Sequence, residues 1–239
     1  MPLTAVYVLR NHIYKKKNII AIIPARGGSK TIPNKNLAPL GGKPLMSYSI
    51  AQAQQSRYVD MIVVSSDSEA ILAEAKQLGA EAIRRPKQMS GDTSKMDLAL
   101  RHALLQLDSI KGYVPDYIVL LQPTSPLRSV ATIDRAIVAF VDNAKKFDSL
   151  IGLCAIESKI GHIKNGRYIA LNKMNMQRQQ LKHMYQECGT IFVFKPSRIL
   201  KKQSLYGARV MPFIVEKRHE ALDINDSHDM NMANYFLTI

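Results

Sequence analysis

An unbroken apolar run at residues 19–23 ends in a glycine-containing loop, and this transition limits the fold more than any other feature of the 239-residue chain. Consecutive apolar residues, most of them β-branched, are typical of a strand that is buried on both faces. In the loop, Gly27 and Gly28 allow a tight turn whose N–H groups can approach an anion. Three cations follow the strand: Arg26, Lys30 and Lys35. The segment therefore predicts a loop that binds phosphate groups, with a nucleotide as the first substrate hypothesis.

The spacing of this loop excludes two common phosphate-binding motifs. It has neither the G-x-x-x-x-G-K-[ST] pattern of ATPase loops nor the G-x-G-x-x-G pattern of dinucleotide-binding folds. A basic turn between a strand and a helix is the alternative, since glycine and lysine are common in loops. Its place directly after a buried strand favours a ligand site, because open α/β sheets bind ligands at the carboxyl ends of their strands.

Strand and helix patterns alternate along the first part of the chain. Further short apolar runs lie at residues 61–64 and 118–121. A capping box formed by Ser66 and Glu69 begins one predicted helix, and another is predicted after Ser129. This alternation predicts right-handed crossovers and an α/β fold, with a mostly parallel sheet and helices on both faces.

Composition and charge restrict the possible partners. With 46% hydrophobic residues the chain can bury one sizeable core. Its net charge of +14 favours anionic partners, but it has no tryptophan and no RNA-recognition, zinc-finger or basic-zipper motif, so no nucleic-acid partner is expected. No run approaches the ~20 apolar residues of a membrane span, so no membrane partner is expected either. Two widely separated cysteines indicate a reducing compartment, and we expect the cytoplasm.

Two segments fall outside the alternating pattern. Residues 1–17 place a short apolar stretch before positive charge, which is the reverse of the order in a secretion signal. We therefore expect an N-terminal extension, followed by one domain at residues 18–239. Residues 157–189 are rich in Lys, Asn and Gln and lack strand periodicity, so they are predicted to be an insertion.

Five sequence blocks resemble those of one enzyme family. In chain order they are ARGGSKTIPNKN from Ala25, RPKQMSGDTS from Arg85, LLQPTSPLR from Leu120, QRQQL from Gln177 and LDINDSHDM from Leu222. Together they resemble the CMP-sialic acid synthetases, also called acylneuraminate cytidylyltransferases or CMP-nonulosonate synthetases, over nearly the whole chain after residue 17. The resemblance implies a Rossmann-like nucleotidyltransferase fold. It also implies a homodimer in which residues 157–189 form a small dimerisation subdomain that reaches toward the partner's active site.

The resemblance assigns the basic loop to CTP. The CTP-binding residues that it implies are Ala25, Arg26, Ser29, Lys35, Asn36, Arg85 and Ser94. Among them, the phosphates are expected to contact Arg26, Ser29 and Lys35. The ribose is expected to contact Asn36, and the nucleoside Arg85. Without the resemblance, the Arg85 segment is better explained as a solvated arginine pair before a helix N-cap.

The same resemblance places an acidic sugar against Gln122 and Arg178. A guanidinium can donate two parallel hydrogen bonds, which suits the carboxylate of such a sugar. From the residues alone, the alternatives are a rigid proline turn at Gln122 and an exposed polar loop at Arg178. Cys188 stands where the family commonly has asparagine, so we expect a different contact to the sugar's substituents.

An oxygen-rich turn near the C-terminus is the predicted Mg²⁺ site. Mg²⁺ prefers oxygen ligands, often one or two carboxylates completed by water and substrate phosphate. The family's Asp-Ile-Asp element reads Asp223-Ile224-Asn225 here, which implies Asp223 and Asn225 as ligands but removes one charge. Asp226 is the alternative ligand, and it is also a candidate for capping a helix that starts at Ser227.

The implied reaction joins CTP to a nine-carbon acidic α-keto sugar, such as sialic, legionaminic or pseudaminic acid, and releases pyrophosphate. Arg26, Lys35 and Asp223 are the implied catalytic residues, and they would act by positioning and charge stabilisation during in-line attack on the α-phosphate. One rival is a KDO cytidylyltransferase, which lacks the GGSK loop and the QPTSPLR block. The other is a non-catalytic nucleotide- or RNA-binding relative, which Asn225 permits.

Overall fold

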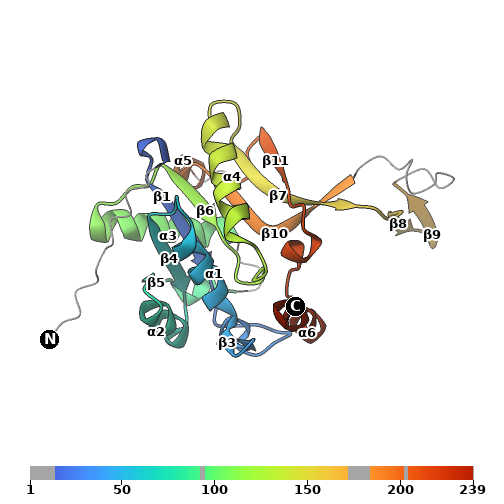
Figure 1. Ribbon diagram of the computed structural model, residues 1–239, viewed down its shortest axis with the longest axis horizontal. Helices are drawn as coiled ribbons and strands as arrows, with labels where there is room; N and C mark the ends of the chain where they lie inside the picture. Colours follow the sequence, from blue (N-terminus) through green and yellow to red (C-terminus); the bar gives the residue numbers. More distant parts are fainter. Residues whose placement is uncertain (1–13, 92–94, 172–183, 202–203, 239) are drawn as a thin grey trace.

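The computed structural model describes residues 14–91, 95–171, 184–201 and 204–238 (Figure 1). A seven-stranded sheet forms its centre, in the order β11-β7-β10-β6-β1-β4-β5. Its strands are β1 (Ile19–Pro24), β4 (Met61–Ser66), β5 (Glu81–Arg84), β6 (Tyr117–Leu120), β7 (Ser149–Ile156), β10 (Met184–Phe194) and β11 (Val210–Ile214). Within this sheet every strand except β10 points the same way. The predicted α/β fold with a mostly parallel sheet is therefore confirmed.

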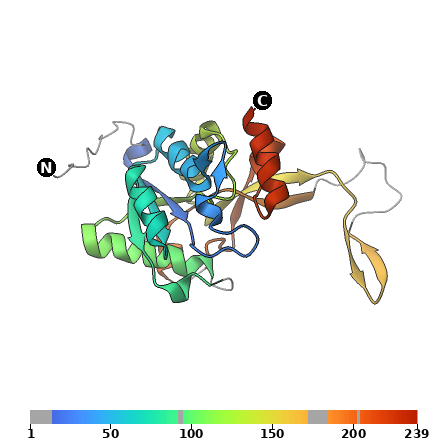
Figure 2. The same ribbon diagram turned by 90° about the horizontal axis from the view of Figure 1, so that it is seen from below.

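Helices cover both faces of the sheet (Figure 2). They are α1 (Leu45–Gln55), α2 (Glu69–Gln77), α3 (Met96–Lys111), α4 (Val130–Asn143), α5 (Pro196–Leu200) and α6 (Ser227–Thr238). Residues Ile19, Ala21 and Ile23 of β1 belong to a core with α1, α2 and α4. Residues Ile20 and Ile22 belong to the opposite core, with α3 and α5. Because successive strand side chains alternate between faces, the apolar run can fill both cores.

Most local signals in the sequence mark real element boundaries. The three predicted strands are β1, β4 and β6, and the hydroxyl of Ser129 accepts the N–H of Thr132 at the start of α4. The predicted capping box at Ser66 is wrong. Ser66 still pairs with β5, its hydroxyl accepts the N–H of Ser68, and α2 begins at Glu69. The sheet pairing extends the strand through the residue that the pattern assigned to a helix cap.

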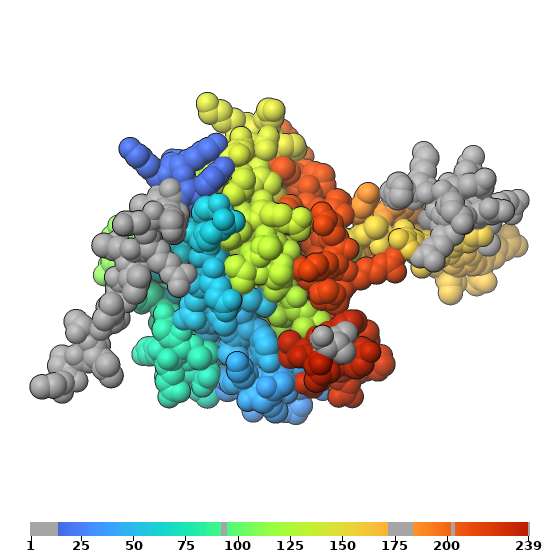
Figure 3. Space-filling view, in the orientation of Figure 1, coloured from blue at the N-terminus to red at the C-terminus, as the bar shows by residue number. Residues whose placement is uncertain are grey.

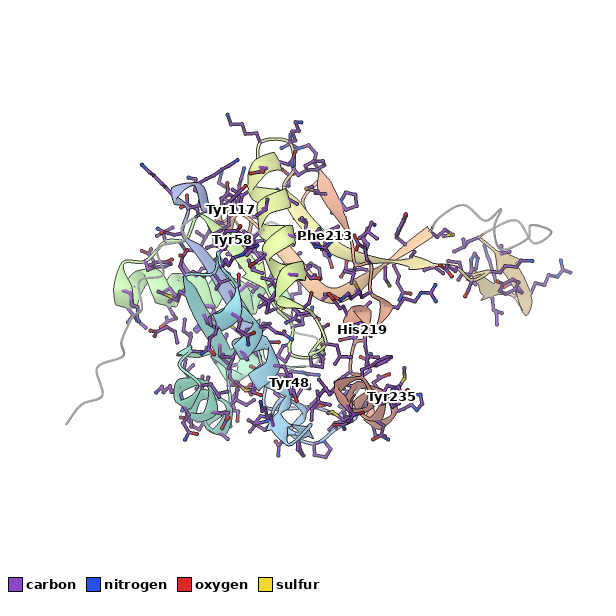
Figure 4. The ribbon with its side chains drawn as sticks, viewed as in Figure 1. Tyr48, Tyr58, Tyr117, Phe213, His219 and Tyr235 are labelled. Atoms are coloured by element: carbon purple, nitrogen blue, oxygen red, sulfur yellow. The ribbon has the colours of Figure 1, made fainter. Side chains whose placement is uncertain are left out.

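The end of the N-terminal extension packs on the domain. It forms a short 3₁₀ helix, η1 (Tyr14–Lys16). The ring centroid of Tyr14 lies 5.1 Å from that of Tyr58, which is labelled in Figure 4. The Tyr14 hydroxyl also donates to Asp142 at 2.8 Å. Residues 1–13 lie outside the described residues.

A hairpin stands at the far end of the sheet from η1 (Figures 1 and 2). Its strands are β8 (Gly161–Lys164) and β9 (Arg167–Ala170). This hairpin occupies the first part of the predicted insertion at 157–189. Residues 184–187, which the sequence analysis included in that insertion, pair with β7 as part of β10. None of the described helices is both long and apolar enough to cross a bilayer.

A buried carboxylate joins α4 to the end of α1. Asp134 is 4% exposed and accepts hydrogen bonds from the Ser56 hydroxyl and from the backbone and side chain of Arg57. We predict that Asp134→Ala lowers the free energy of unfolding by about 2–4 kcal/mol, because it leaves buried donors unpaired. Arg57→Ala should cost less, since the Arg57 side chain is 68% exposed. Urea denaturation of both variants is the measurement, and equal losses would contradict the prediction.

Candidate functional site

A cavity of about 300 Å³ opens at the carboxyl edge of the sheet. Its walls are the loop after β1, the segment after β5, the start of α3 and the turn after β6. The carboxyl ends of parallel strands lie at one edge of a sheet, so loops far apart in sequence meet there. The sequence analysis predicted a ligand site at this edge from the loop after the first strand. The predicted site residues that line this cavity are Arg26, Ser29, Lys35, Asn36, Arg85 and Gln122.

The basic loop is held in shape by the turn between β4 and α2. The backbone N–H of Gly27 donates to Asp67 at 2.9 Å. A Cβ on Gly27 would lie 2.9 Å from the Cβ of Ser68, so the close approach of these segments requires glycine. The side-chain amide of Asn36 donates to the carbonyl of Arg26 at 2.8 Å. Asn36, the predicted ribose contact, thus also closes the loop that carries Arg26.

The ammonium of Lys35 connects the basic loop to the C-terminal acidic turn. It donates to the carbonyls of Ile224 and Asn225, both at 2.9 Å. Burial lowers the pKa of Lys35, and the charge of Arg26 lowers it further, whereas Asp223 raises it. An ammonium has three N–H donors. Lys35 can therefore hold the acidic turn with two of them and present another to an anion in the cavity.

The oxygens of the acidic turn have different partners. The Asp226 carboxylate accepts the backbone N–H groups of His228 and Asp229 at 2.9 and 3.1 Å, so it caps α6 as the alternative interpretation predicted. The side-chain nitrogen of Asn225 donates to the backbone carbonyl of Asp223. Oxygen Oδ1 of Asp223 is buried and accepts no hydrogen bond from any described residue. Asp223 thus offers a buried oxygen without a described partner, whereas Asp226 uses its Oδ1 as a helix cap.

The acidic turn could hold Mg²⁺ only if substrate phosphate oxygens and water completed the coordination shell. In the described ranges, no group of three or more His, Cys, Asp or Glu side chains could hold a metal. Mg²⁺ often takes only one or two carboxylates and completes its shell with water and phosphate oxygens. The unpartnered oxygen of Asp223 meets that minimal requirement. Asp226 is the weaker candidate, because its carboxylate already caps a helix.

Adjacent arginines in the second sequence block have opposite environments. The Arg84 side chain is 64% exposed and pairs with Glu69. Arg85 is only 6% exposed, lines the cavity and donates through Nε to the Ser90 hydroxyl at 2.9 Å. Burial lowers the pKa of Arg85, and the nearby Asp67 opposes that shift. The solvated-pair interpretation therefore holds for Arg84 and is wrong for Arg85.

Gln122 stands on the cavity wall formed by the turn after β6. Gly189 of β10 lies directly behind its side chain: a Cβ there would fall 2.7 Å from Gln122 Oε1 and 3.1 Å from Ser125 Oγ. The Ser125 hydroxyl is fully buried and has no partner among the described residues. This wall therefore places a carboxamide beside polar groups, where a second ligand can be bound by hydrogen bonds.

Among the other predicted residues that the structure describes, Ala25, Asp223 and Asn225 do not line this cavity. Ala25 is fully buried, and its N–H donates to a carbonyl of β4, so it prolongs the sheet. Ser94 and Arg178 lie outside the described residues. Conversely, Ser90 and Lys95 line the cavity and were not singled out by the sequence analysis. Their position in the sequence could have identified them, because Ser90 lies within the Arg85 block and Lys95 directly follows it.

A sequence-family model described as cytidylyltransferase matches residues 20–225. The matched range contains the basic loop, the Arg85 block, Gln122 and Asp223. The chain belongs to the cytidylyltransferase family. This family match confirms the prediction that the chain is a nucleotidyltransferase enzyme.

Curated cytidylyltransferases resemble the chain over most of its length. A pseudaminic acid cytidylyltransferase from Campylobacter jejuni is 32% identical over 90% of this chain and 94% of the relative. A CMP-N,N'-diacetyllegionaminic acid synthase from Legionella pneumophila is 30% identical over 92% and 97%. An N-acylneuraminate cytidylyltransferase from Escherichia coli is 29% identical over 91% of this chain, which spans 52% of that relative. The predicted membership of the CMP-nonulosonate synthetases is confirmed by these relatives.

A solved cytidylyltransferase structure has the same fold. A CMP:2-keto-3-deoxy-manno-octonic acid synthetase complexed with CTP gives a TM-score of 0.70, with 92% of this chain and 98% of that chain covered. The two sequences are 16% identical, so this likeness concerns the fold alone. It agrees with the predicted Rossmann-like nucleotidyltransferase architecture.

The charge coupling in this cytidylyltransferase site can be measured directly. We predict that Asp223→Asn lowers the pKa of Lys35 further, because the Asp223 charge favours the protonated ammonium. Asp226→Asn should lower it less, since Asp226 contributes less to that pKa and asparagine still caps a helix. NMR titration of lysines labelled at the ε-carbon is the measurement. A larger shift in the Asp226 variant would contradict the assigned geometry.

Proposed function

We propose that the chain transfers CMP from CTP to a nine-carbon acidic α-keto sugar and releases pyrophosphate. The observation that carries this proposal is the shared cavity of Arg26, Lys35 and Arg85 with Gln122 on another wall. One buried and two half-buried cations suit the triphosphate of a nucleotide, and a polar wall beside them suits a second substrate. The activities named for the pseudaminic, legionaminic and sialic acid relatives support the same reaction.

In the proposed reaction, a sugar hydroxyl oxygen attacks the α-phosphorus of CTP. The new P–O bond forms as the bond to the β-phosphate breaks, and pyrophosphate leaves with its electron pair. Arg26, Ser29 and Lys35 would hold the phosphates, so that the developing charge meets cations already in place. Asp223, whose buried oxygen has no described partner, would receive the hydroxyl proton or help to hold Mg²⁺. Bound Mg²⁺ would add neutralisation of the phosphate charge.

The acceptor sugar would lie against Gln122. Its carboxamide can donate and accept hydrogen bonds, which suits the polar substituents of an acidic sugar. Arg178 is the proposed partner of the sugar carboxylate, although it lies outside the described residues. Sialic, legionaminic and pseudaminic acids differ in acylamino and methyl groups, so we propose the class of nine-carbon acids rather than one member.

Pyrophosphate release with CTP, Mg²⁺ and a panel of sugars tests the proposal. The panel contains N-acetylneuraminic, N,N'-diacetyllegionaminic and pseudaminic acids, with KDO as the rival acceptor. We expect turnover with at least one nine-carbon acid and a fall of about a hundredfold or more in Lys35→Ala, since one charged contact of this kind is worth about 2–4 kcal/mol of barrier. Lys43→Ala, which removes an exposed lysine, is the matched control and should keep full activity.

Other outcomes of this assay identify the rivals. Turnover with KDO alone would favour the KDO cytidylyltransferase. CTP binding without pyrophosphate release from any sugar would favour the non-catalytic relative. An unchanged kcat/KM in Lys35→Ala would remove Lys35 from the site.

We also propose a homodimer assembled through the β8–β9 hairpin. Its residues Ile163, Tyr168 and Ile169 are 77%, 51% and 41% exposed, and exposed apolar side chains gathered on one projection commonly mark an interface. Figure 3 shows the gold-coloured hairpin projecting beyond the α/β body at one side of the molecule. Sedimentation velocity should give twice the 26.8 kDa chain mass. Ile163→Asp should give the monomer, whereas the exposed control Ile110→Asp on α3 should not.

The cytoplasm is the proposed location of the reaction. Cys154 and Cys188 are both free and buried, as a reducing compartment allows. Cell fractionation with an antibody against the chain is the direct test, and recovery in a secreted fraction would contradict it.

A further inference from the structure

Arg128 has the largest fully buried side chain in the described part of the chain. It follows the turn after β6 and is 2% exposed. No ion pair links it to a described carboxylate; burial lowers the pKa of Arg128 to about 9, and the charge of Glu220 opposes that shift. Burying a charge is costly unless its hydrogen bonds are satisfied. The burial of Arg128 can therefore be understood only from the hydrogen-bond acceptors around its guanidinium.

The acceptors of Arg128 come from three separate parts of the fold. Nη2 donates to the backbone carbonyl of Gln122 at 2.6 Å. Nε donates to the backbone carbonyl of Thr190 in β10 at 2.7 Å. Nη1 donates to Ser49 and Gln52 of α1 at 3.0 and 3.3 Å. The planar guanidinium thus joins the turn after β6, the middle of β10 and helix α1.

One of these acceptors belongs to a residue of the cavity wall, and a second lies next to it. Gln122 lines the cavity, and its side chain rests against Gly189, the residue before Thr190. Arg128 therefore holds both backbone segments that set the position of the Gln122 carboxamide. Arg128 itself does not line the cavity.

The turn after β6, which contains Gln122 and Thr124, also contacts the acidic turn near the C-terminus. The Thr124 carbonyl accepts the N–H of Ile224 at 2.7 Å, and the Gln122 carbonyl accepts the N–H of Ser125. At the C-terminal end of the turn after β6, the side-chain nitrogen of Gln52 donates to the carbonyl of Pro126 at 2.6 Å. A shift of the turn would therefore move the segment that follows Asp223 as well.

We propose that Arg128 is a positioning residue for the acceptor-sugar half of the site. Its guanidinium fixes the carbonyls of Gln122 and Thr190, so that the Gln122 carboxamide stands ready for the sugar. This inference rests on the proposed transfer of CMP to an acidic sugar. CTP, held by the basic loop on the opposite side of the cavity, is bound without the help of Arg128.

Arg128→Lys is the decisive variant, because lysine keeps the charge but cannot reach all three directions of the fork. We expect kcat/KM for the accepted sugar of the panel to fall by about 30-fold or more. The Kd for CTP, measured by calorimetry with MgCl₂, should change by less than about threefold. Arg135→Lys, at an exposed arginine that pairs with Glu216, is the matched control and should change neither quantity.

Hydrogen exchange gives a readout that does not depend on the sugar. In Arg128→Lys the amides of Ser125 and Ile224 should exchange about tenfold faster or more, while the central amides of β4 keep their protection. If Arg128→Lys fails to fold, Ser49→Ala replaces it, with a smaller loss confined to sugar turnover. An unchanged sugar kcat/KM in Ser49→Ala would then count against the proposal.

The two proposals fail in different ways. An inactive wild-type enzyme with faster exchange in Arg128→Lys would reject the sugar substrate and keep the positioning role. An active wild type whose Arg128→Lys variant keeps its sugar kcat/KM within about threefold would reject the positioning role alone. Equal losses for the sugar and for CTP binding would also overturn it, since they would indicate a general loss of structure.

Discussion

Strand β1 has no exposed side chain between Ile19 and Ile23, so both faces of the sheet must be covered by helices. Helices α1, α2 and α4 cover one face, and α3 and α5 cover the other. Crossover connections of this kind return every parallel strand to the same direction, and their carboxyl ends collect at one edge. The basic loop after β1, the Arg85 segment after β5 and the Gln122 turn after β6 meet there for that reason.

Electrostatics then give this edge its chemical character. Arg26 lowers the pKa of both Lys35 and Arg85, so these cations are close enough to repel one another. Burial adds to that cost because it removes the water that would stabilise each charge. A bound polyanion relieves both effects at once. The cavity thus suits a polyanion such as the nucleotide of the proposed function, and Lys35 also donates to two carbonyls of the turn that carries Asp223.

Much of this arrangement could be read from the chain itself. The central strands and the helix start at Ser129 were predicted because apolar periodicity and capping depend on neighbours close in sequence. The loop position was predictable because ligand sites in such sheets follow the carboxyl ends of strands. The capping box at Ser66 failed because pairing with β5, a contact from further along the chain, extended β4 through it. The roles of Ser94 and Arg178 stay predictions.

The sequence by itself determined the alternation of strands and helices and the basic character of the first loop, because both depend on residue type and short-range spacing. Only the tertiary structure decided which of two adjacent arginines, Arg84 or Arg85, is buried at the cavity. It likewise decided that Asp226 caps a helix while Asp223 keeps a buried oxygen without a described partner. Arg128 shows the reason most clearly: two of its acceptors, Thr190 and Ser49, lie 62 and 79 residues away in β10 and α1, and no local pattern encodes such contacts.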